Sequence, residues 1–184
     1  MKKMFAITAV FLPAFLAVFV FTSCRSAPLP GPEIIPVVYA CSPQLQPFEP
    51  HEFELRVFEL TNLERARQRL PALIWYQTAS CVAREHSRDM ESNNIMRPRG
   101  SDGSDSRQRL ERAGITNMRF SDVNIAGGWL TPEEVVTAWM DSPRHRPNIL
   151  SREFTHLGVG FFQRPTDSNA RFATYWTQKF FVFD

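Results

Sequence analysis

The hydrophobic period of this 184-residue chain changes once, and this change constrains the fold most strongly. In residues 51–69 apolar side chains recur every three or four positions, which predicts an amphipathic helix ended by Pro71. The apolar positions of that helix are Phe53, Val57, Leu60, Leu63 and Ala66. From residue 157 onward apolar residues alternate with others, which predicts strands. Helices followed by paired strands predict the α+β class and exclude a repeated strand–helix–strand fold.

Three further helices are expected. One covers residues 78–92 with His86 and Met90 on its buried side, and a short one is capped near Ser104 and stops at Gly114. The segment TPEEVVTAWM has a threonine cap, a proline at the first helical position and a glutamate three residues after the cap. Glu133 and Glu134 are therefore assigned to the start of a helix and not to catalysis.

The end of the chain predicts an antiparallel hairpin. Leu157, Val159 and Phe161 alternate with other residues, the segment PTDSN is a turn signal, and residues 171–183 alternate again.

The N-terminus has the layout of a bacterial export signal. Two lysines precede an apolar run from Met4 to Phe21, and the ending FTSC resembles a lipobox in which Cys24 carries lipid. The alternative is an uncleaved membrane anchor, and both readings tether the protein outside the cytoplasm, in the bacterial envelope. We therefore divide the chain into a signal peptide (1–23), a linker (24–50) and a globular domain (51–184).

The linker is rich in proline, with seven of the fourteen prolines in residues 25–50, and should be an extended spacer. If Cys24 carries lipid, Cys41 and Cys81 remain in an oxidising compartment, where a disulfide between them is expected. The alternative is two free thiols.

The net charge of +2 comes from Lys2 and Lys3, so residues 25–184 are neutral overall. This balance argues against a nucleic-acid partner.

Six segments, in this order and spacing, resemble the bacterial branch of the CAP superfamily of cysteine-rich secretory proteins, antigen 5 and pathogenesis-related proteins. They are ELTNLERARQRLPALIW, AREHSRDM, SDVNIAGG, TPEEVVTAWMDSPRHRPNIL, HLGVGF and YWTQKF. The resemblance covers residues 54–182 and implies a three-layer α-β-α sandwich, with helices on both faces of a small antiparallel sheet and a cleft on one side.

The resemblance also implies a cleft lined by histidines and glutamates, which in some members bind zinc or another divalent ion. The resemblance implies a histidine at position 98, a glutamate at position 123 and a histidine at position 145, and these positions hold Pro98, Val123 and His145. Asn124, which follows Val123, matches the asparagine that follows the glutamate in the family. Proline and valine side chains offer no ligand atom, and one histidine does not hold zinc. We therefore expect a degenerate cleft with no metal or other cofactor, although zinc stays an alternative.

Three other residues are candidates for the cleft or for catalysis. His86 is expected on the buried side of its helix, in the core of the domain, with a position in the cleft as the alternative. His156 opens a strand and could neighbour His145, and Asp122 precedes Val123, from which it should point to the opposite face. No nucleophile-elbow motif is present.

The leading hypothesis is a lipid-anchored CAP-domain protein that binds a hydrophobic small molecule or a macromolecule of the envelope or host. The alternative is a hydrolytic or metal-dependent enzyme that uses His145 with Asp122 or His156. A third possibility is a structural envelope protein without a ligand.

Overall fold

The structure is a computed structural model that describes residues 50–184. These residues form a four-stranded sheet and five helices, in the order α1 (Glu52–Arg67), β1 (Ile74–Trp75), α2 (Gln77–Ser92), α3 (Ser106–Arg112), β2 (Met118–Gly127), α4 (Pro132–Asp141), α5 (Arg146–Ile149), β3 (His156–Gln163) and β4 (Thr174–Phe183).

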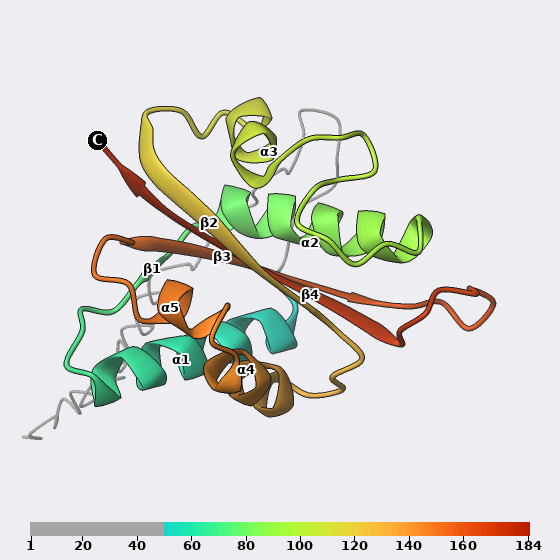
Figure 1. The fold of residues 1–184 in the computed structure, drawn as a ribbon, viewed down its shortest axis with the longest axis horizontal. Coiled ribbons are helices and arrows are strands. Elements are labelled where there is room, and N and C mark those ends of the chain that lie inside the picture. Colours follow the sequence, from blue (N-terminus) through green and yellow to red (C-terminus); the bar gives the residue numbers. More distant parts are fainter. Residues whose placement is uncertain (1–49) are drawn as a thin grey trace, which may run out of the picture. The chain divides into compact units, whose positions relative to one another are not determined.

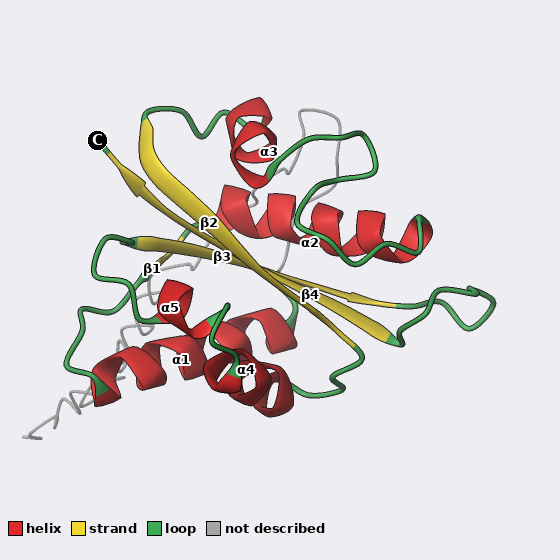
Figure 2. Ribbon diagram, viewed as in Figure 1, coloured by secondary structure: helices red, strands yellow, loops and turns green. Residues whose placement is uncertain are grey.

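The elements form three layers. Helices α2 and α3 lie on one face of the sheet, and α1, α4 and α5 lie on the other (Figures 1 and 2). The α+β class and the α-β-α sandwich are confirmed. The expected hairpin is also confirmed, because β3 and β4 pair antiparallel from His156 opposite Phe181 to Gln163 opposite Thr174.

The sheet differs from the expected purely antiparallel one. Its strand order is β1-β3-β4-β2, and the short β1 runs parallel to β3. Strand β2 pairs only with β4, in antiparallel register, so it forms one edge of the sheet. Neither β1 nor β2 carries a clear apolar alternation, since β1 is two residues long and β2 is exposed over much of its length.

The helix starts follow the local capping rules. At α4, the Thr131 hydroxyl accepts the Glu134 N–H, and the Glu134 carboxylate accepts the Thr131 N–H, as the capping box predicted. Glu133 pairs with Arg56 of α1 across the outer surface. Both glutamates therefore have structural roles.

Helix α1 confirms the predicted stripe only in part, because Val57 is buried and Phe53 and Leu60 pack against the core. Leu63 is 51% exposed, whereas the buried positions are Glu54, Val57, Thr61 and Arg65. The sequence prediction missed Glu54, Thr61 and Arg65 because these residues are polar. Each of them is buried with hydrogen-bond partners that are distant in the sequence. Glu54, for example, pairs with Arg84 of α2 and accepts the Phe161 N–H of β3 at 2.9 Å.

Helix α2 packs very closely on β3 because two glycines face it. A Cβ atom on Gly158 would lie 2.3 Å from the Ala79 carbonyl carbon, and one on Gly160 would lie 2.0 Å from the Arg84 nitrogen. The predicted buried side of this helix is confirmed, because Ala79, His86 and Met90 have almost no exposed surface.

The predicted signal peptide, the Cys24 lipidation site and Cys41 lie outside the described residues. Among the helices of the described part, none has the length and apolar character needed to span a membrane.

Candidate functional site

A surface cavity of about 670 Å³ contains the residues that the sequence singled out. It lies along the outer edge of β2. One wall comes from the loop after α2 and the other from the turn between α4 and α5. Its lining residues are Met96, Arg97, Pro98, Asp122, Val123, Ile125, Ala126, Gly127, Arg144, His145, Asn148 and Phe172. We call this cavity the edge pocket.

The edge pocket brings together Pro98, Val123 and His145, which come from three separate elements. It also includes Asp122. Neighbouring side chains of a strand point to opposite faces, but the pocket wraps around the edge of β2 and so receives both. Asp122 does not simply replace a missing ligand, because its carboxylate accepts the Val123 N–H at 2.7 Å.

A buried polar network fixes the wall that carries His145. The Asn124 side chain has no exposed surface, and its amide nitrogen donates to the His145 carbonyl and to Gln178 Oε1, each at 3.1 Å. Its amide oxygen accepts from Asn148 at 3.0 Å, and Gln178 donates to Thr61 of α1 at 2.8 Å. Asn124 was expected to line the cleft, but the structure places it beneath the pocket as a positioning residue.

Arg65 holds the far end of the same wall. Its buried guanidinium donates to the carbonyls of Pro71, Ile149 and Ser151 at 2.7–2.9 Å. Burial lowers the pKa of Arg65, but a guanidinium stays charged at any physiological pH. The cation therefore ties α1 to the segment after α5, which steadies the turn that presents His145.

Most of the charged side chains at the rim of the edge pocket are arginines. Burial first, and the nearby Arg144 second, lower the pKa of His145, so its imidazole is neutral at pH 7. Arg97 and Arg144 are exposed, and within residues 50–184 neither guanidinium has a carboxylate within 4 Å. The pocket therefore combines an apolar floor with two unpaired guanidinium groups and the carboxylate of Asp122.

The donor set does not fit a metal ion. Pro98 and Val123 have no ligand atoms, which leaves His145 and Asp122, and zinc requires three or four. Throughout the described part of the chain, no three His, Cys, Asp or Glu side chains gather closely enough to hold a metal.

His156 is not brought to the edge pocket. Its ring stacks on Phe181 at 5.2 Å and packs edge-on against Tyr76, in an aromatic cluster that does not line the pocket. Its Nδ1 lies 2.8 Å from the Thr155 hydroxyl. Because β3 lies two strands away from β2, the idea that His156 neighbours His145 is not supported.

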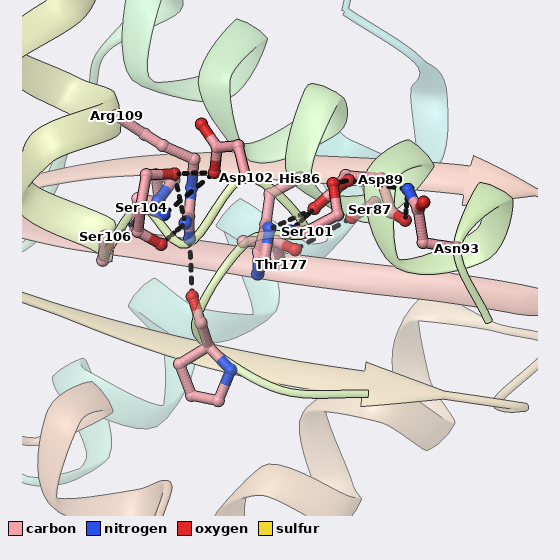
Figure 3. Close-up of polar contacts among 12 residues, drawn as sticks. His86, Ser87, Asp89, Asn93, Ser101, Asp102, Ser104, Ser106, Arg109 and Thr177 are labelled. Carbon is pink, nitrogen blue, oxygen red and sulfur yellow. Dashed lines mark hydrogen bonds and ion pairs between the residues drawn. The ribbon is translucent and has the colours of Figure 1, made fainter. Parts of the chain in front are cut away.

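His86 lies in a different cavity, of about 450 Å³, between α2 and α3 (Figure 3). The residue is 1% exposed, and its ring nitrogens have no hydrogen-bond partner within residues 50–184. Its Nδ1 lies 3.9 Å from the Asp89 carboxylate. Burial and the charges of Arg109 and Lys179 lower the pKa of His86 to about 3. The structure therefore places His86 in the α2–α3 layer and not in the edge pocket.

Eight lining residues of the edge pocket were not among the site candidates from the sequence, and they include Arg97, Arg144, Asn148 and Phe172. Arg144 and Asn148 stand in the segment SPRHRPNIL, so their closeness to His145 was a usable signal. Phe172 had none, because it enters the pocket from the loop before β4.

Known proteins share this sequence pattern. A model of the cysteine-rich secretory protein family, CAP, matches residues 58–180. The uncharacterized protein YkwD of Bacillus subtilis is 39% identical over 128 residues, which cover 70% of this chain and 46% of YkwD. The uncharacterized membrane protein YlbC of the same organism is 32% identical over 127 residues, which cover 69% of this chain and 34% of YlbC. The chain thus spans less than half the length of these two relatives.

Two solved structures are similar in fold. An extracellular protein with an SCP domain from Bacillus anthracis has 30% identity and a TM-score of 0.61, covering 74% of this chain and 45% of that one. An outer surface protein of Borrelia burgdorferi has 18% identity and a TM-score of 0.65, covering 74% of this chain and 97% of that one. The second similarity bears on the fold alone.

Proposed function

Because this chain belongs to the cysteine-rich secretory protein family, we propose that it is an extracytoplasmic binding module whose edge pocket takes an anionic ligand with an apolar part. One observation carries the proposal. The pocket surrounds Pro98, Val123 and His145 with an apolar floor, including Phe172, and places unpaired arginines at its rim. Apolar contact and charge attraction are binding functions that need neither a metal nor a nucleophile.

The location of the module outside the cytoplasm is part of the proposal. Its support is the N-terminal sequence, with Cys24 as a lipidation site, and the 30% identity to a protein named extracellular. A disulfide between Cys41 and Cys81 would join the proline-rich linker to α2, where Cys81 is 2% exposed. Mass spectrometry of the protein from bacterial membranes, before and after reduction, tests both modifications.

A metal titration with a gain-of-function variant tests the absence of a metal site. Calorimetry on the wild-type domain should show no stoichiometric zinc binding. The double substitution Pro98→His and Val123→Glu supplies two ligand types beside His145 and should create measurable affinity. Tight zinc binding by the wild type that is lost in His145→Ala would overturn the proposal.

Binding itself is tested with 1-anilinonaphthalene-8-sulfonate, a probe that has an apolar ring system and one sulfonate. Its fluorescence should rise on binding, and Phe172→Ala should weaken the affinity roughly fivefold by removing apolar contact. Leu63→Ala is the matched control, because Leu63 is exposed on α1 and lies outside the pocket. Equal loss in both variants, or no binding, would count against the edge pocket.

A second candidate function rests on a different observation, the presence of Asp122 and His145 in one pocket. A neutral imidazole can act as a base, and the carboxylate could orient it in a hydrolytic enzyme. The test is a hydrolase screen with ester and peptide substrates. Activity that survives chelators and disappears in both His145→Ala and Asp122→Asn would favour the enzyme over the binding module.

A further inference from the structure

We propose that the occupant of the edge pocket is an extended polypeptide segment that adds to β2 as a fifth strand and carries two consecutive acidic residues. The inference rests on the proposed function, and it names the chemical class of the ligand. Its first support is topological. Strand β2 is an outermost strand, so one side of its backbone has no neighbouring strand in the described sheet.

The outward backbone groups of β2 can be identified from two hydrogen bonds. The Val123 N–H donates to the Asp122 carboxylate at 2.7 Å, and the Ile125 carbonyl accepts from the Trp139 indole at 3.2 Å. Backbone groups of an antiparallel strand alternate between its two sides. Ser121, Val123 and Ile125 are therefore the residues whose N–H and C=O groups face away from β4.

Part of this edge is left without a partner. Within residues 50–184, no side chain bonds the Val123 carbonyl, the Ile125 N–H or either backbone group of Ser121. The Val123 N–H now donates to the Asp122 carboxylate, and the carbonyl of an added strand can replace that carboxylate as the acceptor. A short strand can thus pair along Ser121–Ile125, a length of roughly 17 Å.

The outer edge of β2 lies in a groove. The edge pocket follows β2 from Asp122 to Gly127, and a second hollow of about 320 Å³ continues along Arg119–Asp122. Walls on both sides would contact the side chains of an added strand, which is how strand addition gains specificity.

The charges of the two walls define the ligand. Arg97 lies in the loop after α2, Arg144 lies in the turn before α5, and these two helices cover opposite faces of the sheet (Figure 1). Successive side chains of an added strand point to opposite faces. Two consecutive acidic residues would therefore each meet an unpaired guanidinium, with the aliphatic neighbours along the strand facing Val123 and Phe172.

The experiment uses a fluorescein-labelled peptide, Thr-Val-Asp-Glu-Val-Thr, and measures anisotropy with the domain at low salt. Replacing the acidic pair by Asn-Gln should weaken binding about fivefold, as expected for exposed ion pairs. Methylating two alternate backbone nitrogens, which removes ladder donors, should weaken it at least about tenfold if both bonds form.

Arginine variants assign the charge contacts. Arg144→Gln should remove about half of the difference in binding free energy between the acidic and amide peptides, because Arg97 still meets the other acidic residue, whereas Arg146→Gln should keep the whole difference. Arg146 is a matched control, because it is exposed two residues away and does not line the pocket. Binding that ignores backbone methylation, or an equal effect of both variants, would overturn strand addition.

Two further outcomes separate the inference from the proposed function. If the sulfonate probe binds and the peptide does not, the strand-addition inference fails while the binding module stands; if neither binds, both fail. Sedimentation that shows a dimer dispersed by Asp122→Lys would assign the edge to a second copy of the chain and would also overturn the inference.

Discussion

The buried imidazole of His86 should make the protein less stable as the pH falls. Burial, together with the charges of Arg109 and Lys179, lowers the pKa of His86 to about 3, whereas the charge of Asp89 opposes this only in part. An unfolded histidine has a pKa of about 6.5. The folded state therefore binds fewer protons than the unfolded state between these two values, and stability is lost as the pH falls through that window.

The magnitude follows from the pKa difference. Each pKa unit corresponds to about 1.36 kcal/mol, so lowering the pH from 7 to 4.5 should cost roughly 2.5 kcal/mol through His86 alone. Substitution of His86 by leucine removes this titration. At pH 7 the substitution should be neutral or stabilising, because it also removes two buried ring nitrogens that lack a partner within residues 50–184.

Urea denaturation of the wild type and His86→Leu at pH 7.0, 5.5 and 4.5 measures the effect. All other titrating groups are shared, so the difference between the two free energies of unfolding isolates His86. His156→Leu is the control, since His156 is partly exposed and should give a smaller change. Parallel dependence of stability on pH for the wild type and His86→Leu would refute the reasoning.

Three further substitutions test the packing around the site. Asn124→Ala should cost about 2–4 kcal/mol in urea denaturation, because Gln178 and the His145 carbonyl lose buried partners; a cost below about 1 kcal/mol would contradict the network. Gly160→Ala should cost about 3 kcal/mol or more and lower the thermal midpoint, since its Cβ would lie 2.0 Å from backbone of α2. Lys179→Met should stabilise the protein by about 1–3 kcal/mol at pH 7, because burial lowers the pKa of Lys179 well below its usual range. That gain should vanish above a pH of about 10.4, where the unfolded lysine is also neutral.

Local signals were enough for the elements whose stability is local. The capping box at Thr131 and Glu134 fixed the start of α4 because both bonds join residues three apart. The alternation in residues 157–183 predicted the hairpin because its two strands are close in sequence and pair directly. The overall layers came from the family resemblance, since no local pattern says which face of the sheet a helix covers.

Distant partners explain what the sequence could not predict. Thr61 and Arg65 are buried because they bond Gln178 and the carbonyls near Ser151, which lie more than 80 residues away. A prediction from hydrophobic periodicity assigns such polar residues to the surface, and it therefore identifies the wrong face of the helix as the buried one around Leu63. Strand β2 was not predicted from the sequence for a related reason: a partly exposed edge strand has no strong alternation of apolar and polar residues.

The candidate site was predictable in part. The meeting of Pro98, Val123 and His145 in one pocket was predictable, because the family resemblance assigns them to three elements of known order. His86 was expected in the core, which the structure confirms, but the cleft stayed an alternative for His86 and for His156, since a histidine in an apolar pattern fits both environments. Only the packing shows that one lies between α2 and α3 and that the other lies in an aromatic cluster.

The valine at position 123 affects the interior as well as the pocket. Val123 lies directly opposite Lys179 in the register of β2 and β4, and directly opposed residues share one face of the sheet. A glutamate at position 123, which the family resemblance implies, would place a carboxylate across from this lysine. With valine there, the Lys179 ammonium nitrogen bonds the Ser106 hydroxyl at 2.9 Å, and no carboxylate of residues 50–184 lies within 4 Å of it. Burial lowers the pKa of Lys179 well below its usual range, and valine at position 123 leaves no carboxylate opposite this lysine on β2 to oppose that effect, so the lost pocket carboxylate and the low pKa of Lys179 are linked through one pair of strands.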